Sequence, residues 1–322
     1  MKLLEVNNLT TYYKLKEGYV RACENISLQL DKGEALGLVG ESASGKTTAA
    51  LSLVKLLPDN AHVMGGSIRI DGREISGATE DELRSIRWKE ISIIFQGAMN
   101  ALNPVRRVGD QIVEALRIHE KMSEKEACRK MAELFNKVEI DPERVREYPH
   151  EFSGGMRQRV MIAMAIACNP KVVIGDEPTT ALDVMVQAQV LQLLEELRRE
   201  WQMGMILITH DLSVVGETCD KVAVMYAGRI VENGPTEKVF EQPAHPYTRA
   251  LISAFPNIEG ERHLASSIPG NPPNLLNPPS GCRFHERCQE VFAPCKTDDP
   301  TSTEISSGHL ASCHLLKGRV KL

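Results

Sequence analysis

The chain has 322 residues, more than one average domain requires, so we expect one large domain or two unequal domains. Its 42% hydrophobic and 25% charged residues are typical of a water-soluble globular protein. The 38 Lys and Arg residues against 43 Asp and Glu residues give a formal net charge of −5, which argues against nucleic-acid binding.

The sequence also argues against a secreted or membrane-spanning chain. Residues 1–5 form no signal-peptide core. No apolar run approaches the roughly 18 residues that a spanning helix needs. We therefore expect a cytosolic protein that reaches the membrane only through a partner.

The most informative stretch is residues 40–48, which follow an apolar strand and precede an apolar helix start. The stretch matches the G-x-x-x-x-G-K-[ST] pattern, in which backbone N–H groups and a helix N-terminus attract phosphate. Lys46 would lie along the β- and γ-phosphates, and the Thr47 hydroxyl would hold Mg²⁺. The alternative is an ordinary glycine-rich turn. The predicted nucleotide-binding residues are Gly40, Glu41, Ser42, Ala43, Ser44, Gly45, Lys46, Thr47 and Thr48.

Strands and turns are predicted on both sides of this loop. Residues 31–34 are a turn between two strands, and Asp71-Gly72 is a strong hairpin signal. Residues 227–228 predict a second, closing hairpin. Tyr13 precedes the loop and is either an aromatic that stacks on an adenine ring or an ordinary strand tyrosine.

A helical segment then interrupts the strand pattern. Residues 91–95 form a predicted buried strand that ends in Gln96, which either faces a ligand or lies in a loop. Ser123 opens a capping box, and apolar residues follow it at helical spacing. We expect a helical subdomain at about residues 98–168, inserted into an α/β domain.

Three further groups of polar residues lie at the ends of predicted elements. Ser153-Gly154-Gly155 precedes a helix and is either a second anion site or a plain N-cap. Asp176 and Glu177 end an apolar strand; Asp176 suits water-mediated Mg²⁺ binding and Glu177 suits a general base. The alternative is two solvated loop carboxylates. His210 follows another buried strand and either touches a γ-phosphate or has a structural role.

The order of these motifs over residues 1–240 resembles that of ABC-type ATPases. The resemblance implies an α/β P-loop ATPase with a mixed sheet core, an antiparallel β subdomain and a helical subdomain. The corresponding motifs are Walker A at 40–48, the Q-loop Gln96, the signature at 152–156, Walker B at 172–177, the D-loop at 181–183 and the switch His210. The resemblance implies catalytic roles for Glu177, His210 and Gln96. It also implies that Thr47 and Gln96 contact Mg²⁺. The residues that it implies as nucleotide contacts are Tyr13, Gln96, Asp176, Ser153, Gly154, Gly155 and Asp183.

More narrowly, residues 151–165 and 245–251 resemble the D-type ATPase subunit of oligopeptide and dipeptide importers. Ala43 departs from the pattern by replacing a usual glycine, which costs backbone freedom. Phe152 and Met156 replace the commoner Leu and Gln of the signature.

The resemblance also implies partners. ATP would lie between this Walker A and the signature of a second, F-type ATPase subunit. The pair would dock on two transmembrane permease subunits at the cytoplasmic face of the membrane, through the region around Gln96 and the helical insertion. An extracytoplasmic substrate-binding protein would deliver the cargo, which is peptide in most relatives and nickel or oligosaccharide in others.

A soluble ABC ATPase of DNA repair or translation is the alternative from a different class. A repair ATPase would carry a long coiled coil between Walker A and the signature, and residues 49–151 show no sustained heptads. A ribosome-acting protein would normally carry two cassettes, and the chain has a single Walker A motif.

The composition changes in the predicted extension, residues 241–322. It is rich in proline and is expected to be irregular. Four cysteines with the spacing C-x₅-C-x₆-C-x₁₇-C suggest a metal site in a cytosolic chain; they are Cys282, Cys288, Cys295 and Cys313. Four thiolates suit a [4Fe–4S] cluster, which importer ATPases with a similar tail carry. The alternatives are Zn²⁺, bound with help from His285, His309 or His314, and free thiols.

Overall fold

The structure is a computed structural model that describes residues 2–97, 101–254 and 268–318. The chain divides into two compact units. Unit 1 comprises Met1–Leu4, Leu30–Ala35 and Arg69–Ile208, and unit 2 comprises Glu5–Gln29, Leu36–Ile68 and Thr209–Leu322. The predicted start of the helical subdomain, residue 98, lies outside the described residues.

Unit 1 contains a parallel sheet of three strands, β6 (Ile91–Ile94), β7 (Val172–Asp176) and β8 (Gly204–Ile208). Every residue of β7 and β8 is buried, in keeping with their Val- and Ile-rich sequences and with parallel strands covered on both faces. Strands β6 and β7 end at the same edge of the sheet, so Asp176 and the residues after β6 emerge together.

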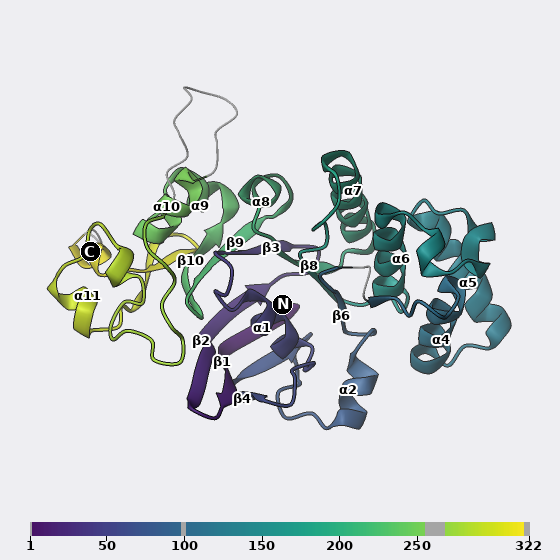
Figure 1. Ribbon diagram of the computed structural model, residues 1–322, viewed down its shortest axis with the longest axis horizontal. Helices are drawn as coiled ribbons and strands as arrows, with labels where there is room; N and C mark the ends of the chain where they lie inside the picture. Colours follow the sequence, from purple (N-terminus) through teal and green to yellow (C-terminus); the bar gives the residue numbers. More distant parts are fainter. Residues whose placement is uncertain (1, 98–100, 255–267, 319–322) are drawn as a thin grey trace. The chain divides into compact units, whose positions relative to one another are not determined.

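The helical segment of unit 1 is built on α4 (Val108–Glu120), α5 (Glu124–Lys137) and α6 (Gly154–Ile166), which contact one another (Figure 1). The predicted capping box is confirmed, because Ser123 accepts a hydrogen bond from Glu126 N and the Glu126 side chain accepts one from Ser123 N. The part of this unit that the structure describes also contains β5 (Arg73–Glu74), α2 (Glu80–Ile86), η1 (Pro142–Arg146), η2 (Pro149–Glu151) and α7 (Val184–Trp201).

Five strands of unit 2 lie next to one another in the order β11-β12-β10-β9-β3. Strand β3 (Ala35–Val39) runs parallel to β9 (Lys221–Tyr226), which pairs antiparallel with β10 (Arg229–Pro235). The predicted hairpin at residues 227–228 is therefore confirmed. Strand β3 leads directly into the glycine-rich loop and α1 (Lys46–Leu53).

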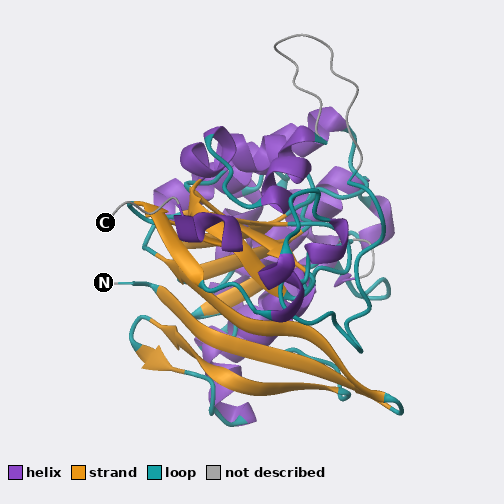
Figure 2. Ribbon diagram, turned by 90° about the vertical axis from the view of Figure 1, so that its left-hand side faces the viewer, coloured by secondary structure: helices purple, strands orange, loops and turns teal. Residues whose placement is uncertain are grey.

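A second sheet of unit 2 is made of long N-terminal strands (Figure 2). It contains β1 (Leu4–Leu15), β2 (Gly18–Leu30) and β4 (Ala61–Ile70), in the order β2-β1-β4. The hairpin predicted at Asp71-Gly72 is confirmed, since β4 pairs with β5 from Ile70 to Arg73. The turn predicted at residues 31–34 is confirmed, since Glu34 N donates to Asp31 O at 3.2 Å, and it joins β2 to β3, which belongs to a different sheet.

The C-terminal part of unit 2 is less irregular than the sequence predicts. Strands β11 (Ser302–Ser306) and β12 (His309–Ser312) form a hairpin, and β12 pairs with β10, so the extension lengthens the sheet. The prediction failed because these strands are short and polar, and a long-range neighbour stabilises them. The other elements are α8 (Leu212–Thr218), α9 (Thr236–Glu241), α10 (Pro246–Ser253), η3 (His285–Arg287), α11 (Ala293–Thr297) and η4 (His314–Gly318).

None of the helices in the described ranges combines the length and the apolar character needed to cross a bilayer.

Candidate functional site

The glycine-rich loop of unit 2 folds tightly between β3 and α1. Gly40 and Gly45 have φ angles of 147° and 105°, and a Cβ at either position would approach a backbone oxygen, of Met225 or Ala22, to 2.1 or 2.2 Å. Both positions therefore require glycine. The loop has the compact backbone that a phosphate cradle needs.

Lys46 begins α1 and turns back into the loop. Its Nζ donates to Gly40 O at 2.7 Å, to Glu41 O at 2.9 Å and to Ser44 Oγ at 3.4 Å, and the residue is only 7% exposed. The first turn of α1 contains no acidic residue, so the helix N-terminus retains its partial positive charge. An ammonium group and a helix N-terminus thus meet at one point, which suits phosphate.

The other predicted residues of the loop lie around this point. Ser42, Ala43 and Thr47 are exposed, whereas Thr48 is buried. Ala43 has a φ of 62°, so the residue that replaces a usual glycine is held in the left-handed region. The Tyr13 hydroxyl lies 3.2 Å from Thr48 Oγ1, which places this half-buried aromatic next to α1.

In unit 1, Gln96 and Glu177 meet at the end of the parallel sheet. Gln96 Nε2 donates to Glu177 Oε2 at 2.8 Å, and Thr180 Oγ1 donates to the same oxygen at 2.9 Å. Glu177 has a φ of 48°, a strained value for a residue with a side chain, and its N–H donates to Ile208 O at 2.9 Å. The backbone after β7 therefore turns sharply and aims the carboxylate at Gln96.

Asp176 differs from its neighbour in burial, being only 3% exposed at the end of β7. Glu177 is half-buried. Two adjacent carboxylates thus have different surroundings, as the alternation of side chains along a strand predicts.

The predicted signature and D-loop also lie side by side in unit 1. Ser153 caps α6 by accepting from Met156 N at 3.3 Å. A Cβ on Gly155 would come within 2.4 Å of Val186 Cγ1, so the glycine lets the start of α6 approach the start of α7. Asp183 caps α7 by accepting from Val186 N at 3.0 Å, a structural role that spacing alone did not reveal.

His210 belongs to unit 2 and is exposed in the turn before α8. Its neighbours fix that turn, since Asp211 N donates to Thr209 Oγ1 at 3.0 Å and Asp211 caps α8. The predicted residues thus form two groups, one in each unit.

The four clustered cysteines are free thiols in the C-terminal part of unit 2. Cys282 N donates to Cys295 O at 2.9 Å, which joins two of them. Burial, with a smaller contribution from the nearby thiols of Cys313, Cys295 and Cys288, raises the pKa of Cys282 to about 11. Yet among the described residues no group of three or more His, Cys, Asp or Glu side chains is arranged to hold a metal ion.

The three histidines considered as zinc ligands already have partners. His285 Nδ1 contacts Cys282 O at 2.9 Å, His309 Nε2 contacts Glu232 Oε1 at 2.7 Å, and His314 Nε2 contacts Asp298 O at 2.7 Å. Each contact fixes a ring in place, and none joins a histidine to a cysteine sulfur.

Sequence reasoning missed two residues that contact the predicted site. Thr180 shares the Glu177 carboxylate with Gln96. Arg287 forms an ion pair with Glu41 inside the glycine-rich loop, at 2.7 Å. An acidic residue in a phosphate-binding loop indicates that a cation lies nearby, but nothing in the sequence identifies Arg287 as that cation.

Two family models match the sequence. A model described as "ABC transporter" matches residues 23–180, and one described as "Oligopeptide/dipeptide transporter, C-terminal region" matches residues 231–295. The chain is 49% identical to an "Oligopeptide transport ATP-binding protein OppD" from Salmonella typhimurium, over 97% of this chain and 93% of the relative. It is 44% identical to an "Oligopeptide transport ATP-binding protein AppD" from Bacillus subtilis, over 97% of this chain and 96% of the relative.

The fold also resembles solved structures. One is a dimer of the ATP-binding cassette MJ0796 bound to ADP and Pi, with a TM-score of 0.65 and 27% identity over 72% of this chain and 98% of that chain. Another is cbiO1 from Clostridium perfringens, part of the cbiONQ ABC transporter complex, with a TM-score of 0.64 and 28% identity over 75% of this chain and 91% of that chain.

Proposed function

The chain belongs to the ATP-binding subunits of oligopeptide ABC transporters, and from that premise we propose that it hydrolyses ATP to power the import of dipeptides and oligopeptides. The observation that carries the proposal is the loop at residues 40–48. Its two required glycines, the buried Lys46 and the N-terminus of α1 together form a cradle for the phosphates of ATP.

We assign each of these predicted residues a role in ATP hydrolysis that fits its surroundings. Lys46 would exchange its bonds to loop carbonyls for bonds to the β- and γ-phosphates. Mg²⁺, held by Thr47, Gln96 and, through water, Asp176, would neutralise charge on the phosphates. Glu177 would accept a proton from the attacking water, and its bonds from Gln96 and Thr180 orient it for that task.

The remaining assignments follow from the family. Tyr13 would stack on adenine, and His210 would contact the γ-phosphate. Ser153, Gly154, Gly155 and Asp183 would contact the nucleotide of a partner ATPase. We also propose two domains for the chain. Residues 1–240 form the ATPase domain, with a helical subdomain at about residues 98–168, and residues 241–322 form the extension.

The catalytic assignment is tested by Glu177→Gln in the assembled transporter. The amide keeps the size of the side chain but cannot accept the proton, so hydrolysis should slow by roughly 10²–10⁴-fold. ATP binding should persist, and the ATP-bound closed dimer should accumulate. Near-normal turnover would show that another group is the base.

Two surfaces of unit 1 support the proposed partners. A cavity of about 350 Å³ lies beside Gln96, and Phe95 at its edge is 37% exposed; this apolar groove suits a helix of a permease subunit. Val184 and Met185, next to Asp183, are 83% and 73% exposed, which suits a contact with a second, F-type ATPase. A substrate-binding protein would complete the importer, with this chain peripheral at the cytoplasmic face of the membrane.

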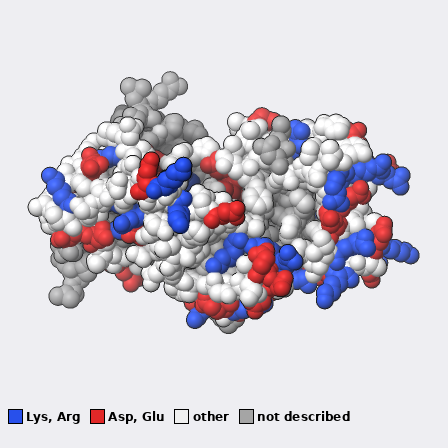
Figure 3. Space-filling model, turned by 60° about the horizontal axis from the view of Figure 1, so that its bottom comes forward, with Lys and Arg blue, Asp and Glu red and all other residues white. Residues whose placement is uncertain are grey.

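The charge distribution supports a protein partner over a nucleic acid. On the face drawn in Figure 3, Lys and Arg side chains are interspersed with Asp and Glu. Copurification with membrane subunits, rather than with DNA or ribosomes, tests this. Import of nickel or oligosaccharides would use the same ATP chemistry, and binding assays on the extracytoplasmic receptor distinguish the cargo.

We also propose that Cys282, Cys288, Cys295 and Cys313 hold one [4Fe–4S] cluster. Four free thiols, three of which raise the pKa of Cys282 by their proximity, fit a four-cysteine donor set, and the side chains would have to move into ligand geometry. The cluster would supply folding energy to a proline-rich segment. Zn²⁺ remains the alternative metal.

A further inference from the structure

Arg287 lies in the C-terminal segment, which is the predicted extension at residues 241–322. It holds the side chain of Glu41 in the phosphate-binding loop. Arg287 Nη1 donates to Glu41 Oε2 at 2.7 Å, and Nη2 donates to Oε1 at 2.9 Å. This is the two-pronged pairing that a planar guanidinium makes with a carboxylate. Arg287 is 8% exposed, so water competes little for the pair.

The guanidinium of Arg287 is itself fixed on its other sides. Its Nε donates to Pro269 O at 2.7 Å, and its Nη1 donates to the Tyr226 hydroxyl at 3.2 Å. It also lies 5.9 Å from the ring centroid of Phe284, within range of a cation–π contact. Groups outside the loop therefore hold the guanidinium of Arg287 in addition to Glu41.

The backbone of Glu41 is held as well. Glu41 N donates to the Tyr247 hydroxyl at 2.9 Å, and Glu41 O accepts from Lys46 Nζ at 2.9 Å. A displacement of Glu41 would thus also displace Lys46, which is proposed to bind the phosphates.

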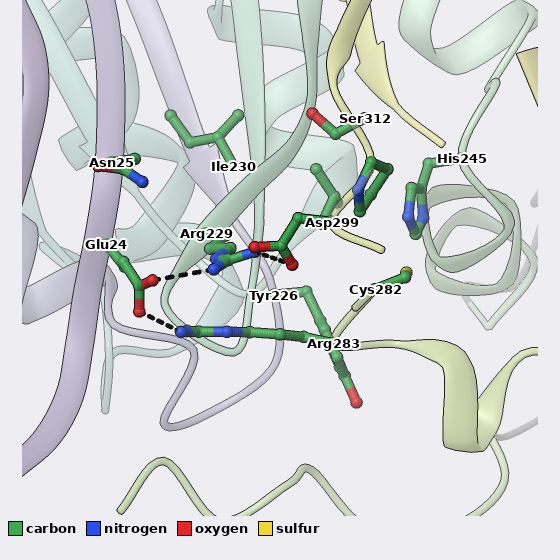
Figure 4. A pocket seen from close by; sticks show the side chains of 12 residues that line it. Glu24, Asn25, Tyr226, Arg229, Ile230, His245, Cys282, Arg283, Asp299 and Ser312 are labelled. Atoms are coloured by element: carbon green, nitrogen blue, oxygen red, sulfur yellow. Dashed lines mark hydrogen bonds and ion pairs between the residues drawn. The ribbon is translucent and has the colours of Figure 1, made fainter. Parts of the chain in front are cut away.

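A second contact joins the same C-terminal segment to the loop. Arg283 donates to Ala227 O and pairs with Glu24, which also pairs with Arg229 (Figure 4). Next to Ala227, Gly228 N donates to Ser44 O at 2.8 Å. The loop is therefore attached to the C-terminal segment at two places, directly at Glu41 and through one turn at Ser44.

We propose that Arg287 is a positioning residue for nucleotide binding, which acts by holding the phosphate-binding loop and by neutralising Glu41. The proposal rests on the proposed function, in which residues 40–48 bind ATP. An unpaired carboxylate in this loop would repel the triphosphate. A loop held in shape before ATP arrives loses less conformational entropy on binding.

The test compares ATP affinity, measured by calorimetry on the full chain, among variants of this pair. Arg287→Gln should weaken ATP binding by roughly five- to tenfold, the lower range for coupled sites. Arg287→Lys keeps the charge but loses the two-pronged contact, so its affinity should lie between those of Arg287→Gln and the wild type. Adding Glu41→Gln to Arg287→Gln should restore most of the lost affinity, because it removes the unpaired carboxylate.

Arg249→Gln is the matched control, because Arg249 belongs to an exposed ion pair with Glu290, at 2.6 Å, and not to a pair with a residue of the loop. Its ATP affinity should equal that of the wild type. If the wild type binds ATP and Arg287→Gln binds it with the same affinity, this inference is overturned but the proposed function is not. A loss that neither Arg287→Lys nor Glu41→Gln reduces would also overturn it, because Arg287 would then act on the fold in general and not through Glu41. A wild type that does not bind ATP would overturn both this inference and the proposed function.

Discussion

The phosphate-binding loop, residues 40–48, and the cysteine segment, residues 282–313, acquire their geometry in different ways. In the loop, Lys46 bonds to carbonyls within six residues of itself, and glycines supply the turns. In the cysteine segment, the backbone joins Cys282 to Cys295, while Cys313 packs with Ala311 and Leu316. The contiguous motif supplies its own turns and its own lysine contacts, and distant residues such as Arg287 add to them, whereas the spaced cysteines depend entirely on the fold around them.

The largest predicted effect concerns the metal of the cysteine segment. Anaerobically purified protein should be brown and hold about four irons per chain, as expected for a four-cysteine [4Fe–4S] site. Replacing Cys288 with serine should abolish this iron, because the cluster would lose a ligand. Elemental analysis and the visible absorption spectrum measure it.

Cys128→Ser is the matched control, because Cys128 is an exposed free thiol on α5 in unit 1. Its iron content should equal that of the wild type. Stoichiometric zinc without iron would replace the cluster with a zinc site. Protein without metal under anaerobic conditions would leave four free thiols.

The next effect concerns the loop itself. Lys46→Ala removes charge-assisted contacts to phosphate, each worth about 1.5–3 kcal/mol. ATP affinity should fall by roughly one to two orders of magnitude. Calorimetry with the full chain checks this, and unchanged binding would mean that Lys46 does not contact the phosphates. The iron content should stay at the wild-type level, which separates the loop from the cysteine segment.

The sequence predicts the elements whose signals are local. The capping box at Ser123, the hairpin at Asp71-Gly72 and the buried strand before Asp176 are all present, because each depends on a few neighbouring residues. The pairing of Gln96 with Glu177 follows from two strands that end at the same edge of a parallel sheet. The strand pattern of the sequence was therefore sufficient to predict that Gln96 and Glu177 lie close together.

Contacts between distant segments could not be predicted from the sequence. Glu41 and Arg287 are 246 positions apart, and no periodicity connects them. Strands β11 and β12 were expected to be irregular, since their polar residues resemble a loop until β10 is seen to pair with β12. The roles of Tyr13 and His210 stay predictions, because they depend on a nucleotide that the residues alone do not supply.

The smallest predicted effect concerns a buried contact that attaches β12 to β10. Glu232 is 1% exposed and accepts from His309 Nε2 at 2.7 Å and from the N–H groups of Ala244 and His245, each at 2.8 Å. Burial alone would raise the pKa of Glu232, but these hydrogen bonds hold it below its usual value. Glu232→Gln should lower the free energy of unfolding by about 1–3 kcal/mol near neutral pH.

The sign of the pH dependence follows from that lowered pKa. A carboxyl whose pKa is lower in the folded state contributes stability above the ordinary glutamate pKa, and this contribution is lost as the pH falls through the folded value. The difference between the wild type and Glu232→Gln should therefore shrink in acid. His245, whose pKa burial lowers to about 4, is present in both proteins and does not create that difference. Urea denaturation over a pH series measures it, with Glu290→Gln as the control, because Glu290 belongs to an exposed ion pair worth about 0–1 kcal/mol. A difference that grows in acid would show that Glu232 is protonated in the folded protein.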